Sequence, residues 1–142
     1  MNYAEEQTVI RKLFLDGWDS TTTPVMFSGE PGLTKGATNI PDEKGLKEWV
    51  RITLNTNGAS QRDMAGPESR VRYLGMLTIN VFVKSATGAP MRARVLFDMI
   101  EQKFSRRQVG AITFQTASPG LTTQAEGFFQ MTLQMPFYRD NI

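Results

Sequence analysis

The chain has 142 residues, of which 40% are hydrophobic and 21% charged, with a formal net charge of +2. These values are typical of a single globular domain, residues 1–142, and argue against a disordered or fibrous chain. The sequence has no cysteine and no histidine, which excludes disulfides, thiolate nucleophiles, the usual zinc sites and the commonest general base. It has neither a signal-peptide pattern nor an apolar run of about 20 residues, so we expect no membrane contact and a place in the cytoplasm.

The N-terminal part predicts a helix, a short strand and a long loop. Asn2 and Glu5 have the spacing of a capping box, and apolar residues then recur at helical spacing, so a helix is expected over 3–17. The segment TTTPVMFSGEP, residues 21–31, predicts a short strand. The run from Pro31 to Gly45 is rich in glycine and proline and predicts a long loop.

Four further strands and a second helix are expected after this loop. WVRITLN, residues 49–55, alternates between apolar and polar side chains and predicts a strand. The segment from Asn55 to Ser69 contains turn signals and predicts a projecting arm, followed by a long strand over 71–85. A helix is expected within 85–107, with Thr87 as its cap and Pro90 in its first turn. AITFQTA and GFFQMTLQMPFYRD complete the sheet.

This order of elements predicts an α+β fold. Runs of strands interrupted by helices, without regular βαβ repetition, indicate a mostly antiparallel sheet. We expect the two helices to pack on one face of this sheet and the long loops to project from it.

The long strand VRYLGMLTINVFVKS is apolar on both faces. Val71, Tyr73, Leu77, Ile79, Val81 and Val83 form the expected core face. The opposite face carries Leu74, Met76 and Phe82, and Trp49 occupies the corresponding face of the preceding strand. An exposed apolar patch of this kind favours a subunit interface, because interface centres are enriched in aromatic residues and methionine. The alternative is that these four residues scatter or are covered by the long loops.

No catalytic, metal or cofactor site is predicted. GEPGLTKG, residues 29–36, does not match a phosphate loop, because Lys35 neither follows a glycine nor precedes Ser or Thr. The acidic pairs Asp16 with Asp19 and Asp42 with Glu43 are more typical of turns than of paired catalytic carboxylates. The densest basic group favours a solvated helix face or an interface rim over a nucleic-acid surface; it comprises Arg92, Arg94, Lys103, Arg106 and Arg107.

The stretch RVRYLGMLTINVFVKSATGAPMRARVLFDMIEQKF, residues 70–104, resembles tail terminator proteins of long-tailed bacteriophages. Arg72 and Gly75 early in the long strand and Gly88 in the following turn carry this resemblance. The N-terminal helix, EWVRITL at 48–54 and QMPFYRD at 134–140 fit the same layout, so the similarity spans nearly the whole chain. The Pro31 to Gly45 loop is longer than the connection expected for the family.

The resemblance implies a structural virion protein of the tail and neck, assembled in the host bacterial cytoplasm, and no enzyme. Such a protein forms a hexameric ring on the head-proximal end of the tail tube, stops tube polymerisation and offers a docking surface to the head connector. Its partners are other copies of itself, the tail tube protein and the head-tail connector protein. DNA passes through the channel without specific binding, and no cofactor is implied.

Two sets of residues are expected to make these contacts. Trp49, Leu74, Met76 and Phe82 are expected at the subunit interface. Residues in the loops are expected to reach neighbouring subunits, the tube or the connector, namely Lys35, Asn57, Arg62, Asp63 and Met64. The alternatives are a head-tail connector or head-completion protein and, less favoured, a nucleic-acid-binding module with salt-dependent affinity.

Overall fold

The computed structural model describes residues 2–61, 71–125 and 127–141. It contains two helices, α1 (Tyr3–Leu15) and α2 (Ala89–Phe104). In the described part of the chain nine strands form one sheet: β1 (Val25–Phe27), β2 (Leu33–Lys35), β3 (Thr38–Ile40), β4 (Glu48–Gln61), β5 (Val71–Lys84), β6 (Gln108–Val109), β7 (Ile112–Phe114), β8 (Ser118–Ala125) and β9 (Phe128–Asn141).

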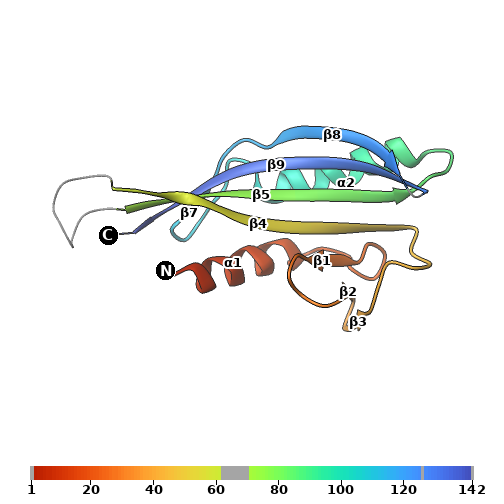
Figure 1. Cartoon of the computed structure of the whole chain (residues 1–142), viewed down its shortest axis with the longest axis horizontal. Coiled ribbons are helices and arrows are strands. Elements are labelled where there is room, and N and C mark those ends of the chain that lie inside the picture. The colour runs from red at the N-terminus through yellow and green to blue at the C-terminus, as the bar shows by residue number, and fades with distance from the viewer. Residues whose placement is uncertain (1, 62–70, 126, 142) are drawn as a thin grey trace.

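The strands follow the order β3-β2-β1-β4-β5-β9-β7-β6, and β8 also pairs with β9. Among the described strands every pair is antiparallel except β1 with β4. The expected α+β class with a mostly antiparallel sheet is therefore confirmed. The three 14-residue strands β4, β5 and β9 run side by side along the longest axis of the molecule (Figure 1).

Local sequence signals predict the start of α1 and only part of the start of α2. The Glu5 amide donates to Asn2 Oδ1 at 2.8 Å and the Asn2 amide donates to Glu5 Oε2 at 3.1 Å, so the predicted capping box is confirmed. Helix α1 ends at Leu15, two residues earlier than expected. The predicted cap of α2 is wrong, because Gly88 occupies the cap position with φ 89° and no side chain caps the helix.

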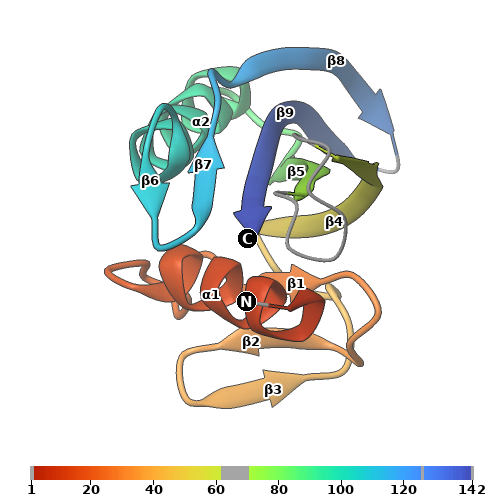
Figure 2. The same ribbon diagram turned by 90° about the vertical axis from the view of Figure 1, so that its left-hand side faces the viewer.

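One hydrophobic core lies where the helices meet the sheet. The predicted core face of β5 is confirmed at Leu77, Ile79, Val81 and Val83, which are buried together with the apolar sides of α1 and α2. The rings of Phe14 in α1 and Phe104 in α2 stack with centroids 6.1 Å apart. Seen along the longest axis, α1 and α2 lie outside the long strands (Figure 2).

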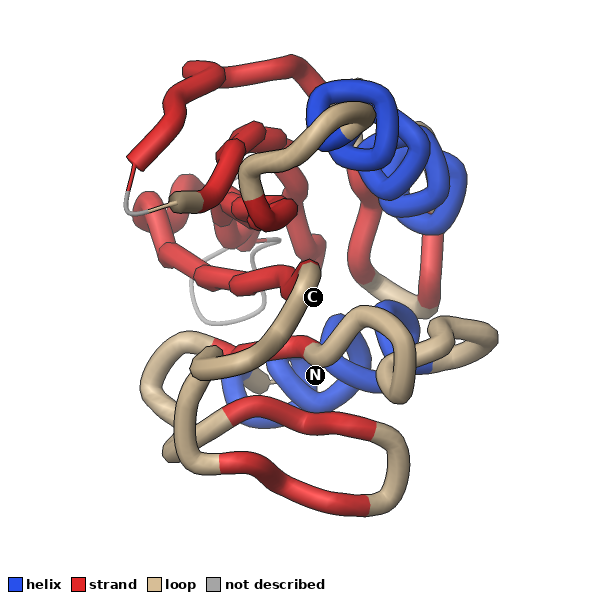
Figure 3. The backbone as a smooth tube through the Cα atoms, turned by 90° about the vertical axis from the view of Figure 1, so that its right-hand side faces the viewer, coloured by secondary structure: helices blue, strands red, loops and turns tan. Residues whose placement is uncertain are grey.

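Three segments differ from the sequence-based expectation. The predicted loop Pro31 to Gly45 contains the β2–β3 hairpin, whose Leu33 is fully buried and whose Thr34 pairs with Val25 of β1. These two strands lie side by side at the edge of the sheet (Figure 3). Residues 55–61 of the predicted arm continue β4 instead of leaving the sheet, with a bulge between Thr56 and Gly58. The rest of that arm, residues 62–69, lies outside the described residues.

The third difference is β8, which the sequence did not predict. Its segment SPGLTTQA contains proline and glycine and has little apolar alternation. It pairs only with β9 among the described strands, as expected for an edge strand that tolerates proline.

Candidate subunit interface

The face of the long strands opposite the core is organised in cross-strand rows. Trp49 of β4 lies opposite Phe82 of β5, and Phe82 lies opposite Gln130 of β9. The Trp49 and Phe82 rings stack almost in parallel, with centroids 4.1 Å apart and planes 9° apart. Alternation along the strands thus brings together two of the four residues expected at an interface.

This aromatic end of the face is largely closed within the single chain. Trp49 is only 6% exposed, and its indole N–H has no hydrogen-bond partner among the described atoms. Phe82 is half-buried, and the Arg51 guanidinium lies 5.4 Å from its ring centroid. The pair therefore has little surface left for a neighbouring molecule, and its assignment to an interface stays a prediction.

The middle of the face is polar and internally bonded. Asn80 is buried, and its side-chain amide lies 2.8 Å from the Thr132 hydroxyl and 3.1 Å from the Arg51 guanidinium. These contacts account for a buried asparagine on this side of the sheet, since a buried amide without partners would be costly.

The other end of the face carries a partly exposed apolar surface, which we call the sheet patch and define as Leu74, Met76, Pro136 and Tyr138. Leu74 is 42% exposed and lies opposite Tyr138, while the half-buried Met76 lies opposite Pro136. Arg72 borders the patch. It donates from Nε and Nη2 to the two carboxylate oxygens of Asp140 at 2.8 and 2.9 Å, and lies 3.8 Å from the Tyr138 ring centroid.

The residues expected in partner-contacting loops are not brought together. Lys35 is half-buried at the end of β2, and Asn57 is exposed at the bulge of β4. Strand β2 and the far end of β4 lie toward opposite ends of the long axis (Figure 1). Arg62, Asp63 and Met64 lie outside the described residues.

A second uncovered apolar surface lies on α2 and was missed by the sequence reasoning. We call it the helix patch and define it as Met91, Val95 and Met99, which are 67%, 40% and 41% exposed. Their spacing of four residues places them along one side of the helix. The signal was readable in the sequence, but α2 is apolar on two sides and the side with Leu96, Phe97 and Ile100 was the stronger pattern.

Most of the basic group on and after α2 is used inside the chain. Arg92 Nε donates to Glu48 Oε1 at 3.0 Å. Lys103 Nζ donates to the main-chain carbonyl of Asp16, and burial lowers the pKa of Lys103. Arg107 donates to the carbonyl of Lys103 at 3.2 Å. These bonds hold neighbouring segments together, so the group does not form a continuous free basic surface.

The acidic pairs form turns, as predicted. Asp19 Oδ2 accepts from the Thr22 hydroxyl at 2.7 Å, and Asp42 Oδ1 accepts from the Lys44 amide at 3.0 Å. Within the described residues no group of three or more acidic side chains could hold a metal ion. No described helix is long and apolar enough to cross a membrane.

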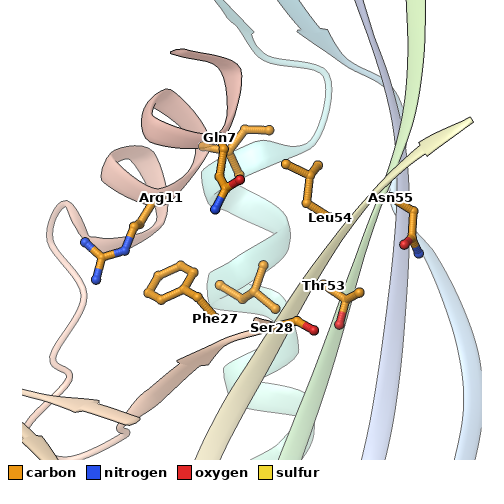
Figure 4. Close-up of a pocket in the computed structure, with 9 residues that line it drawn as sticks. Gln7, Arg11, Phe27, Ser28, Thr53, Leu54 and Asn55 are labelled. Carbon is orange, nitrogen blue, oxygen red and sulfur yellow. The ribbon is translucent and has the colours of Figure 1, made fainter. Parts of the chain in front are cut away.

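A crevice of about 180 Å³ lies between α1, β1 and β4 (Figure 4). Gln7 and Arg11 line it from α1, and Leu54 points toward it from β4. Arg11 lies 3.5 Å from Glu30 and 4.7 Å above the Phe27 ring, so its charge already has a partner. The lining residues do not combine a nucleophile with a base.

The fold and these surfaces define an α+β protein built on three long strands, with uncovered apolar residues on the sheet and on α2. No protein-family model and no curated protein matches the chain. A solved structure whose recorded name states no function is similar, with a TM-score of 0.60 and 20% sequence identity over 96% of each chain. At this identity the likeness establishes a shared fold alone.

Proposed function

We propose that this protein is a structural virion protein that closes into a ring at the head-proximal end of a phage tail tube. There it ends tube polymerisation and gives the head connector a docking surface. The family resemblance implies six copies in this ring. The observation that carries the proposal is the sheet patch, where Leu74 is 42% exposed on the side of the sheet opposite the core. An apolar surface that a chain leaves uncovered marks an interaction site.

The rest of the molecule supports an assembly role over a chemical one. In this proposal both helices occupy one face of the sheet, which leaves the other face to a neighbouring subunit. The internal bonds of Arg92 and Lys103 engage two members of the densest basic group within the chain. That arrangement suits a channel through which DNA passes without specific binding. The ring needs no cofactor and carries out no catalysis.

The proposed partners are the neighbouring subunits, the tail tube protein and the head-tail connector. Lys35 on the β2–β3 hairpin and Asn57 at the β4 bulge lie far enough apart to touch different partners. Arg62, Asp63 and Met64 follow Asn57 in the sequence and are proposed to contact partners on the sequence alone.

The proposal is tested by mixing the purified protein with polymerising tail tube protein of the same virion. Electron microscopy then measures the length and the ends of the tubes. We expect capped tubes that stop growing, and we expect Leu74→Asp to lose this effect. Ala4→Asp is the matched control, because Ala4 is exposed on α1, which packs on the side of β5 opposite the sheet patch. Tubes that grow unchanged in the presence of wild-type protein reject the terminator role, and binding to the connector alone would then favour a head-completion protein.

A further inference from the structure

The helix patch is an exposed apolar surface, as interfaces are, and its three residues are not buried within the chain. Among the described residues five large hydrophobic side chains are exposed, and three of them are Met91, Val95 and Met99. At 100° per residue their mean direction is opposite that of the buried Ala93 and Phe97 on α2. A surface helix ordinarily places polar residues there.

The helix patch and the sheet patch lie on opposite sides of the molecule. Helix α2 covers the core face of the sheet, so its outward side faces away from the sheet. Leu74 lies on the other sheet face, since Tyr73 and Gly75 beside it point toward the core side, where Tyr73 meets Tyr3 of α1. One chain cannot bring these two patches into contact with each other. A two-fold dimer would bury only one of them, against the same patch of the second copy.

Charge and spacing make the two surfaces complementary. Asp98 is exposed beside the helix patch, and Arg51 lies on the same sheet face as the sheet patch. Neither has an ion-pair partner in the described part of the chain. Met91 and Asp98 are separated by about 10 Å along the helix. On the sheet, Arg51 lies opposite Asn80, and Asn80 is four residues along β5 from Met76. This separation is about 13 Å along the strand, and the length of an arginine side chain can make up the difference from the helix.

We propose that the helix patch of one copy packs on the sheet patch of the next, so that the chain joins to itself head to tail. Met91 then contacts Met76, and Asp98 approaches Arg51. Methionine suits such a contact, because its flexible side chain adapts to an irregular surface. This inference rests on the proposed ring, because a head-to-tail contact repeated with a fixed rotation closes into a ring.

Two variants separate the halves of this contact. The helix variant carries Met91→Asp and Val95→Asp, and the sheet variant carries Leu74→Asp. All three positions are exposed, so the single chains should keep the wild-type melting temperature and circular dichroism. Ala4→Asp matches Met91→Asp, since both add a carboxylate to the first turn of a helix, where it is tolerated.

Each variant alone should self-associate about tenfold or more weakly than the wild type, as expected when an interface loses a central residue. Light scattering measures the mass, and a dilution series of amide NMR shifts detects weak association up to millimolar concentration. An equal mixture should form a dimer and nothing larger, because only one intact junction remains. In that mixture the labelled helix variant should shift at β5 amides and the labelled sheet variant at α2 amides.

Several results overturn the inference. They are a wild type without any concentration-dependent shift, a helix variant that assembles like the wild type, or a mixture that stays monomeric. A sheet variant that still dimerises while the helix variant does not would indicate a two-fold contact between α2 helices instead. Tube capping by the wild type without pairing in the mixture rejects this contact and leaves the proposed function standing. Pairing in the mixture without tube capping by the wild type supports this contact and rejects the proposed function.

Discussion

Arg139 in β9 donates from Nε to Glu6 Oε2 in α1 at 2.7 Å, across 133 residues of sequence, and both side chains are buried. The Arg139 guanidinium also lies 4.2 Å from the ring centroid of Tyr73 and 5.1 Å from that of Tyr3. This ion pair links α1, the first helix, to β9, the last strand. Because it is buried, its strength depends on both partners being present.

Removing one partner of this pair should strongly destabilise the fold. Glu6→Ala leaves a buried, uncompensated guanidinium, and we expect a loss of about 3–5 kcal/mol in the free energy of unfolding. Urea denaturation followed by circular dichroism measures it. The double variant Glu6→Leu with Arg139→Met removes both charges and should lose much less. Equal losses in the single and double variants would show that the pairing itself contributes little.

Gly75 provides space for a neighbouring ring. It lies opposite Phe137 in the β5–β9 register, and a methyl group added at Gly75 would overlap the Phe137 ring. The Gly75→Ala variant should therefore lose about 1–3 kcal/mol of stability through overpacking. Thermal unfolding checks this, with Gly120→Ala as a control, since a methyl group there meets only a slightly tight contact with Thr132. Adding Phe137→Leu should recover part of the loss, and no recovery would point to another cause.

The stack of Trp49 on Phe82 should stabilise the single chain. Trp49→Ala is expected to cost about 3–5 kcal/mol, because it removes a large buried ring. Trp49→Phe keeps an aromatic partner and removes an indole N–H without a hydrogen bond, so its stability should stay within about 1 kcal/mol of the wild type. Denaturation of both variants under the same conditions tests this. If Trp49→Phe loses as much free energy of unfolding as Trp49→Ala, stacking is excluded as the source of the stability.

The turn at Asp19 should make a small part of the stability depend on pH. Hydrogen bonds from the Thr22 hydroxyl and then the Thr22 amide lower the pKa of the Asp19 carboxyl below its ordinary value, against a smaller effect of burial. The folded pKa lies below the unfolded one, so this contribution is present above the unfolded pKa and is lost as the pH falls through the folded pKa. An NMR titration of the carboxyl carbon should show a higher pKa in Thr22→Val, and an unchanged value would contradict this cause.

The secondary structure could be predicted where burial leaves a local pattern. The alternation of residues 71–84 identified β5 and its core face, and the spacing of Asn2 and Glu5 identified the start of α1. The β2–β3 hairpin and β8 were missed because few of their described side chains are buried. Their strands form through hydrogen bonds to β1 and β9, which no pattern within the segments records.

The candidate site was predicted only in part for a similar reason. Leu74 and Met76 were expected on the second face, and the structure leaves Leu74 exposed there and Met76 half-buried. Trp49 and Phe82 share that face, but the β4–β5 register places one ring on the other and buries Trp49. The stronger apolar side of α2 is the one that packs on the core, whereas the exposed helix patch on its other side was missed.

The sequence by itself determined the α+β class, the two-sided apolar character of the long strand and the absence of any histidine or cysteine chemistry. These properties follow from residue types and their spacing along the chain. Only the tertiary structure decided which apolar residues stay uncovered, because that depends on which strands become neighbours and on whether another segment covers the second apolar side of α2. The positions of Leu74 and of Met91 on opposite sides of the molecule are therefore properties of the fold.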